Sequence, residues 1–243
     1  MNRFHEMTRC AARICLGLMV CWPAAQALAG VIAFENLPTS GSTLVSYHHE
    51  TGPVLADDFI GARGGAVSRV EWWGGAATSN SWELVFQTNN ALLNVPNRDD
   101  DFTGALAKYL GVIAVGVADD VRNPTLLHYT ADIKNGLLIE AGKPYWLTVA
   151  NYQPDWSWAQ ALGGASVGAE QFNAQRSVAA AGILCMDGGP HCGPWEAVHT
   201  DLAFRINVVP EPGTVALLAA GLLGVAIASC RRPFRLSNLG RIA

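Results

Sequence analysis

Short apolar runs and strict alternations recur along the middle of the chain, and they predict β-strands. The clearest alternation ends this middle section, and its apolar members are Leu202, Phe204, Ile206 and Val208. A period of two places these four side chains on one face of a strand, directed inward. Strands are expected at 31–35, 54–60, 66–73, 81–88, 109–118, 125–131, 145–151, 178–185 and 202–208.

The predicted strands follow one another without clear helices between them, and Gly, Pro, Asn and Asp separate them. No segment keeps a helical i, i+3, i+4, i+7 stripe for three turns, apart from a weak candidate at residues 168–180. This spacing predicts an all-β fold, an antiparallel β-sandwich or jelly-roll-like ectodomain spanning residues 30–209. We expect the first and last strands of this domain to lie near each other.

The N-terminus has the three parts of a secretory signal peptide. Three arginines precede an apolar run at Ile14–Trp22, and the small-residue sequence Ala27-Leu28-Ala29 follows. The run is too short to span a bilayer. Residues 1–29 are therefore predicted to be a signal peptide, cleaved between Ala29 and Gly30. Its expected partners are the Sec translocon and signal peptidase.

The C-terminus predicts a single transmembrane helix. Thr214–Cys230 holds 17 uncharged residues, and Arg231 and Arg232 follow at once. A helix of this length is about 25 Å long, the short limit for a hydrocarbon core. The arginines place the tail at residues 236–243 on the cytoplasmic side.

A Pro-Glu-Pro sequence stands directly before this span, at Pro210, Glu211 and Pro212. The motif, the short apolar helix and the basic tail together resemble the PEP-CTERM sorting signal over about residues 208–235. The resemblance implies an exported protein of a Gram-negative bacterium that makes extracellular polysaccharide. It also implies processing by an exosortase, a membrane-embedded cysteine peptidase that recognises the three motif residues. The implied route runs from an anchored intermediate in the inner membrane to the cell surface or a biofilm matrix.

Composition and charge narrow the possible partners. Half of the residues are hydrophobic and 15% are charged, against about 25% in a usual soluble domain, and the deficit lies largely in the two ends. The seven arginines at the ends leave 9 basic and 18 acidic residues in the middle, a net charge of about −9. Such an acidic body repels phosphate backbones, so no nucleic-acid partner is expected.

Two of the six cysteines, Cys185 and Cys192, belong to the predicted ectodomain. A single pair that brackets a Gly-Gly-Pro turn in an exported chain predicts a disulfide. The alternative is a metal site that adds His191 and His199, but zinc ligand pairs are usually closer in sequence. We expect neither a metal nor a cofactor.

Three further motifs are weak candidates for chemistry. Gly164–Gly168 matches G-x-S-x-G, a nucleophile elbow only when it lies between a strand and a helix of an α/β sheet. Asp99–Asp101 could offer oxygens to Ca²⁺, although a solvated turn is favoured. A polysaccharide hydrolase would need two carboxylates about 5–9 Å apart. The available carboxylates are Asp57, Asp58, Glu71 and Glu83.

The tryptophans leave two interpretations open. Trp156 and Trp158 share a face if the chain is extended there, and one of the neighbours Trp72 and Trp73 must face outward. Exposed rings, with Trp73 as the third, would form a carbohydrate platform, whereas buried rings would fill the core. The leading hypothesis is a non-catalytic surface or matrix protein linked to extracellular polysaccharide. A carbohydrate-binding module is the alternative, and a hydrolase comes third.

Overall fold

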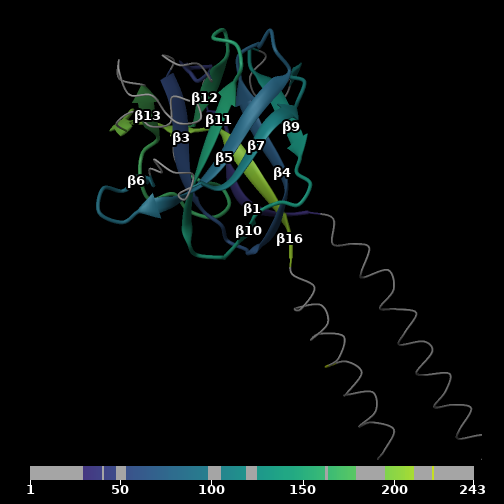
Figure 1. The fold of residues 1–243 in the computed structure, drawn as a ribbon, viewed down its shortest axis with the longest axis vertical. Coiled ribbons are helices and arrows are strands. Elements are labelled where there is room, and N and C mark those ends of the chain that lie inside the picture. The colour runs from purple at the N-terminus through teal and green to yellow at the C-terminus, as the bar shows by residue number, and fades with distance from the viewer. Residues whose placement is uncertain are drawn as a thin grey trace, which may run out of the picture. The chain divides into compact units, whose positions relative to one another are not determined.

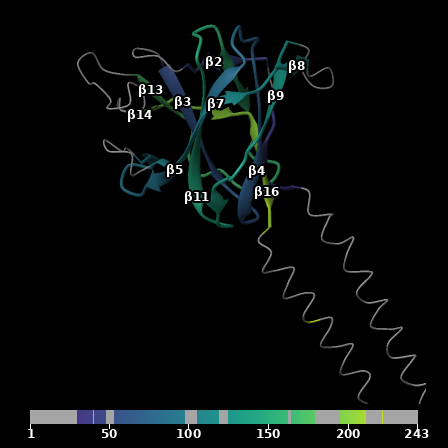
Figure 2. The same cartoon turned by 45° about the vertical axis from the view of Figure 1, so that its right-hand side comes forward.

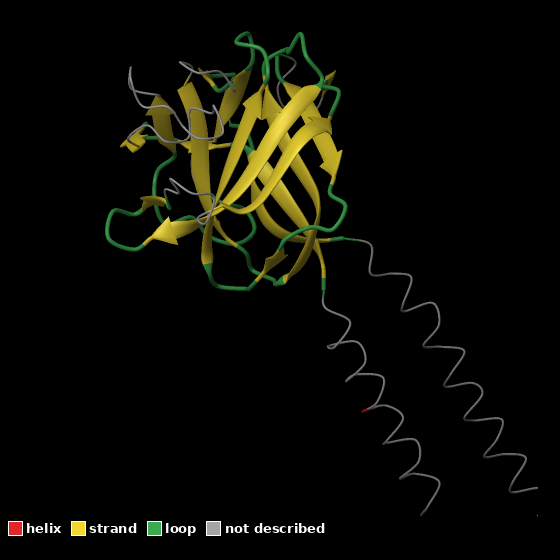
Figure 3. Cartoon of the chain, viewed as in Figure 1, coloured by secondary structure: helices red, strands yellow, loops and turns green. Residues whose placement is uncertain are grey.

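The computed structural model describes residues 30–39, 41–47, 53–97, 105–118, 125–161, 164–178, 195–210 and 221. Gly30–Pro210 forms one compact unit. Its described residues form strands and loops and contain no helix (Figure 3). Across the described part of the chain, no helix is long and apolar enough to cross a membrane. The predicted signal peptide and, apart from Gly221, the predicted transmembrane helix lie outside the described residues.

Two antiparallel sheets build this unit. The first has a central run of five strands in spatial order, namely β1 (Val31–Asn36), β16 (Phe204–Val209), β4 (Gly65–Gly74), β9 (Leu127–Asp132) and β8 (Val117–Ala118). Its smaller strands are β10 (Leu138–Ile139) on β4, and β12 (Ser157–Ala161), which joins β4, β15 (Asp201–Leu202) and β2 (Thr43–Val45).

The second sheet has seven strands. Its order is β14 (Trp195–Ala197), β13 (Gln175–Val178), β3 (Pro53–Ile60), β11 (Pro144–Asn151) and β5 (Ser81–Asn90). Both β6 (Val95–Pro96) and β7 (Ala105–Ile113) pair with β5. Figure 2 shows the two sheets as separate layers, with β3, β5 and β11 in one and β4 and β16 in the other. Every pair of these named strands is antiparallel, so the predicted all-β antiparallel class is confirmed.

The hydrophobic core lies between the two sheets and is rich in aromatic rings. Phe34 on β1 contacts Phe59 on β3, with ring centroids 5.7 Å apart. Trp72 on β4 contacts Trp82 on β5 at 5.1 Å. Rings from opposite layers therefore meet edge to face or tilted, the geometry that the aromatic quadrupole favours. This face-to-face packing makes the domain a β-sandwich.

The first and last strands of the domain pair directly, as expected from the sequence (Figure 1). Val31 lies opposite Val208, and Asn36 lies opposite Phe204. The predicted inward set on β15 and β16, Leu202, Phe204, Ile206 and Val208, has no exposed surface. The chain therefore enters the domain at Gly30, just before β1, and leaves it at Pro210, just after β16, and these two strands pair with each other.

The prediction that Trp73, Trp156 and Trp158 form an exposed carbohydrate platform is wrong, because all three side chains are buried. Trp156 and Trp158 share a face as predicted, but both are fully buried because that face packs against Trp82 and Phe204. Gly74 allows this arrangement, since a Cβ there would lie 2.7 Å from the Trp156 indole nitrogen. Trp73 points away from the main core, yet it is only 2% exposed.

Two predicted segments differ from the observed elements, and five observed strands were not predicted. The single strand expected at 109–118 is two strands, because the chain leaves β7 after Ile113 and joins the other sheet at β8. The weak helical candidate at 168–180 is a loop followed by β13 in its described part, 168–178. The short strands β2, β6, β10, β12 and β14 were not expected.

Candidate functional site

Four carboxylates gather where β3 meets the loop 164–174 and the start of β15, and we call them the acidic cluster: Asp57, Asp58, Glu170 and Asp201. Asp57 and Asp58 are consecutive on β3, so their side chains leave opposite faces of the strand. The sequence suggested these two as carboxylate candidates. It gave no signal for Glu170 or Asp201, because only the fold brings them within range of β3.

Backbone amides hold the two β3 carboxylates in place. Asp57 accepts a hydrogen bond from the amide of Leu202 at 2.6 Å and another from the amide of Asp58 at 3.1 Å. Asp58 accepts from the amides of Gln171 at 2.8 Å and Phe172 at 3.0 Å. Both aspartates are fully buried. They therefore tie the loop and β15 onto β3.

Burial raises the proton affinity of the whole acidic cluster. It raises the pKa of Asp57 well above the ordinary value, helped by the charge of Glu170. The pKa of Asp58 rises to about 6 by burial, against the lowering effect of its two amide partners. Burial and the charge of Asp201 raise the pKa of Glu170 to about 8, and burial raises that of Asp201. Near neutral pH the cluster therefore retains protons.

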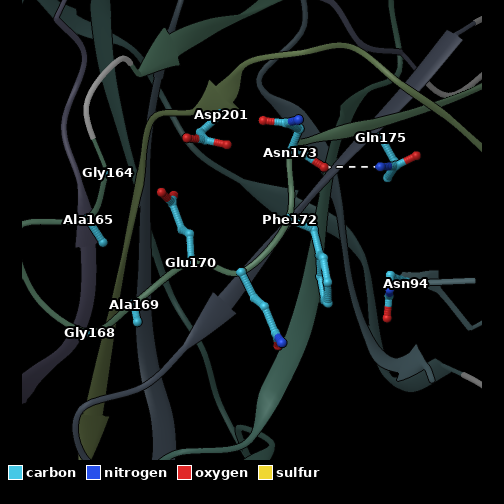
Figure 4. Close-up of a pocket in the computed structure, with 11 residues that line it drawn as sticks. Asn94, Gly164, Ala165, Gly168, Ala169, Glu170, Phe172, Asn173, Gln175 and Asp201 are labelled. Carbon is cyan, nitrogen blue, oxygen red and sulfur yellow. Dashed lines mark hydrogen bonds between the residues drawn. The ribbon is translucent and has the colours of Figure 1, made fainter.

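An open cavity of about 760 Å³ lies beside the acidic cluster. Figure 4 shows the carboxylates of Glu170 and Asp201 directed toward each other on one side of it. The rest of its lining comes from the loop 164–174, the start of β13 and the turn after β5, with amide side chains at Asn94, Gln171, Asn173 and Gln175. Phe172 adds an aromatic ring, which stacks on the buried Trp146 at 6.1 Å and 7°. The cavity thus combines hydrogen-bonding groups with one ring.

A second polar group lies on the outer face of the first sheet, and we call it the Arg205 network: Glu35, Glu71, His128, Arg205 and Asn207. Its residues occupy neighbouring strands, and Arg205 stands directly opposite Glu35 on β1 and Glu71 on β4. The guanidinium donates to Glu35 at 2.6 Å and to Glu71 at 2.9 Å. This register places one cation between two carboxylates.

The Arg205 network also explains why Trp73 is covered. The imidazole of His128 stacks on the Trp73 ring at 4.6 Å and 6°, and the guanidinium of Arg205 lies 5.7 Å from its centroid. Burial alone would raise the pKa of Glu71. Hydrogen bonds from His128 and Asn207, with the charge of Arg205, instead lower it to about 2. The outward tryptophan is therefore covered by His128 and Arg205 and presents no ring to a sugar.

The G-x-S-x-G segment is a turn and has no catalytic partners in the described residues. Gly164 and Gly168 adopt positive φ, 84° and 83°. The Ser166 hydroxyl donates to a carboxylate oxygen of Glu35 at 2.8 Å. An elbow nucleophile would need a histidine base at that position, so this geometry does not build a hydrolase triad.

The remaining predicted sites are the metal site, the other two carboxylates, the disulfide, the Asp99–Asp101 turn and the sorting motif. Across the described part of the chain, no group of three His, Cys, Asp or Glu side chains could hold a metal ion. Glu71 and Glu83 lie on opposite sheets, and Glu83 pairs with Lys108 at 2.9 Å. The predicted disulfide Cys185–Cys192, Asp99–Asp101, and the motif residues Glu211 and Pro212 lie outside the described residues.

The family model of the PEP-CTERM protein-sorting motif matches residues 208–232 of this chain. The match begins within β16 and covers Pro210, Glu211 and Pro212. It confirms the resemblance inferred from the sequence. The motif marks an exported protein that an exosortase processes and that passes through a membrane-anchored intermediate. No curated protein and no solved structure matches the chain.

Proposed function

We propose that this chain is a non-catalytic surface or matrix protein, whose β-sandwich has a structural or adhesive role beside extracellular polysaccharide. The observation that carries the proposal is the junction between domain and motif. The sorting motif begins at Val208, inside the last strand, and Pro210 follows that strand directly. Cleavage after the motif would leave β16 whole, so a complete sandwich would be delivered to the surface.

The hydrogen bonding of the buried carboxylates supports a non-catalytic role. Asp57 and Asp58 are fully buried and accept backbone amides, as groups that fix loops do. The Ser166 hydroxyl donates to Glu35, where a nucleophile elbow would have a histidine base. A structural role accounts for each of these contacts.

Intact-mass measurement of the exported protein tests this proposal in a host that has an exosortase. We expect the mature chain to begin at Gly30 and to lack the segment after the Pro-Glu-Pro motif. Glu211→Ala should leave the C-terminal segment attached and hold the protein in the membrane fraction. Glu196→Ala, which removes an exposed carboxylate on β14, should be processed like the wild type.

Two results would contradict the sorting step. The first is a wild-type mass that still includes Arg231 and Arg232 on the bulk of the surface protein. The second is unchanged processing of Glu211→Ala. Turnover of the host's polysaccharide by the purified protein would separately contradict the non-catalytic assignment.

The cavity beside the acidic cluster supports a second candidate function, carbohydrate binding. Its amides and carboxyls can exchange hydrogen bonds with hydroxyl groups, and Phe172 offers an aromatic surface. In the wild type, calorimetric titration with the host's polysaccharide should then show saturable binding. Gln171→Ala and Asn173→Ala should each weaken it by about fivefold, the value of one lost hydrogen bond.

The control for this titration is Gln153→Ala, an exposed amide in another loop. It should bind as the wild type does, and all three variants should keep the wild-type melting temperature. Absence of binding by the wild type would remove this second function and leave the sorting proposal intact.

A further inference from the structure

The edge formed by β7 and β8 carries a row of exposed apolar side chains. Leu106, Leu110, Ile113, Val115 and Val117 are between 40% and 69% exposed. They are half of the ten exposed large hydrophobic residues found in the described structure, although they occupy a segment of only 14 residues. Scattered exposed hydrophobics need no explanation, but a concentration within one short segment marks an interaction surface.

Within the described structure, β7 and β8 each also have a side without a partner strand. Among the described strands, β7 pairs with β5 alone, and β8 pairs with β9 alone. By contrast, β1 at the end of the first sheet has part of its outer side occupied, because the backbone of Glu35 exchanges hydrogen bonds with Ser166 and Val167. A free edge presents N–H and C=O groups that another strand can pair with.

The edge lacks the charges that usually protect such strands. From Ala105 to Ala118 the one charged residue is Lys108. Its ammonium pairs with the buried Glu83 at 2.9 Å, and its side chain is only 19% exposed. The surrounding domain carries a net charge of about −9, so two copies would repel each other over most of their surfaces. The neutral edge is a place where they can approach without that repulsion.

We propose that β7 is a self-association edge, through which two copies of this chain pair antiparallel about a twofold axis. Antiparallel pairing of a strand with itself is self-complementary, and it brings Leu106, Leu110 and Ile113 of one copy beside those of the other. The contact uses both free edges, so it closes at two copies. The inference needs only the strand and is independent of the sorting proposal.

Two bulges limit how strong this contact can be. Leu110 and Gly111 form one opposite Glu83, with Gly111 at φ 63°, and Leu106 forms the other. Bulges increase the twist of an edge and shorten the ladder that a partner strand can follow. A short strand pair buries less than a stable dimer needs, so a dissociation constant of about 10–100 µM is expected.

Sedimentation equilibrium of the exported protein tests the proposal between about 5 and about 500 µM, a range that spans this affinity. The wild type should move from the monomer mass to twice that mass. Leu110→Lys, and independently Val115→Lys, should weaken the association by at least about tenfold, because each places a charge in the apolar contact, where it would be removed from water. Leu138→Lys is the matched control, since this residue is 52% exposed on β10, and it should associate like the wild type.

Melting curves verify that each variant is folded. If one of the two edge variants, Leu110→Lys or Val115→Lys, does not fold, the other still tests the proposal. Amide hydrogen exchange in residues 105–113 should slow with concentration in the wild type and not in Leu110→Lys. A wild type that stays monomeric, or grows beyond two copies, would overturn the proposal. So would equal effects of Leu110→Lys and Leu138→Lys, or unchanged association of both edge variants.

Discussion

The acidic cluster and the Arg205 network bury the same kind of group with opposite results. Asp58 is fully buried and Glu71 is 7% exposed, so both carboxylates are largely removed from water. The pKa of Asp58 rises to about 6, whereas that of Glu71 falls to about 2. The partners explain the difference, because Glu71 faces Arg205 and His128, while Asp58 faces backbone amides and another carboxylate, Asp201.

This difference assigns each group its own structural task. In the Arg205 network Glu71 is ionised at neutral pH, and the network links β1, β16, β4 and β9 across the outer face of the first sheet. The acidic cluster retains protons and fastens the loop 164–174 and β15 to β3. Burial therefore sets how much a carboxylate needs a partner, and the partner decides whether it is charged.

Removing Arg205, the cation that Glu35 and Glu71 share, should cause the largest loss of stability among these substitutions. Arg205→Ala leaves Glu35 and Glu71 close together without their guanidinium, and breaking a largely buried ion pair in this way is costly. We expect the free energy of unfolding to fall by about 3 kcal/mol at pH 7. Urea titration followed by tryptophan fluorescence measures this loss.

Arg69→Ala is the control for that prediction. Arg69 pairs with Asp132 at 2.7 Å, but the two side chains are 48% and 73% exposed. Solvent-exposed pairs contribute little, so a loss below about 0.5 kcal/mol is expected. If Arg69→Ala destabilised the domain as much as Arg205→Ala, burial would not be the reason for the larger effect.

The acidic cluster and the Arg205 network should affect the pH dependence of stability in opposite directions. The folded-state pKa of Glu170 is raised from 4.5 to about 8, so stability is greatest with its proton bound and falls as pH rises from 4.5 through 8. The pKa of Glu71 is lowered from 4.5 to about 2, so its contribution disappears as pH falls through that interval. The domain should therefore be most stable near pH 4.5, where the two intervals meet.

Two substitutions test which carboxylate causes the loss of stability on each side of the pH optimum. Glu170→Gln should reduce the fall between about pH 5 and pH 8, and solvent at the cavity mouth limits the part due to Glu170 to about 1–2 kcal/mol. The remaining fall belongs to Asp57 and Asp58, whose pKa values are also raised. Glu71→Gln should instead flatten the acid arm. Glu140→Gln, at an exposed pair with Lys143, should leave the profile unchanged. A wild type whose stability rose from pH 5 to pH 8 would show that Glu170 ionises without cost.

The sandwich was predictable because its strands carry local patterns. The alternation at 202–208 fixes which side chains of β15 and β16 face the core, and the apolar run before Asp57 is enough to place β3. Strands of two or three residues, such as β10, have no such pattern. Pairing with β4 creates β10, and no local sequence feature indicates that contact.

The site was less predictable, because its groups meet over long separations in the sequence. Asp58 bonds to residues 113 and 114 positions away, and Asp57 to one 145 away. The strand period predicted that Trp73 or its neighbour points outward, but it did not predict that other side chains bury the Trp73 ring. Arg205 and His128 reach it from two other strands, so exposure could not be derived from alternation alone.

Ser166→Ala should have a much smaller effect than Arg205→Ala, because Ser166 lies at the rim of the Arg205 network. The Ser166 hydroxyl donates to a Glu35 carboxylate oxygen at 2.8 Å, while its backbone amide bonds to the Glu35 carbonyl at 2.7 Å. The substitution removes only the hydroxyl, and Arg205 still faces Glu35, so a loss of about 0.5–1 kcal/mol is expected. Urea titration should detect this loss, and ester hydrolysis should be absent before and after the change. An esterase activity that disappeared in Ser166→Ala without any loss of stability would instead make Ser166 a nucleophile.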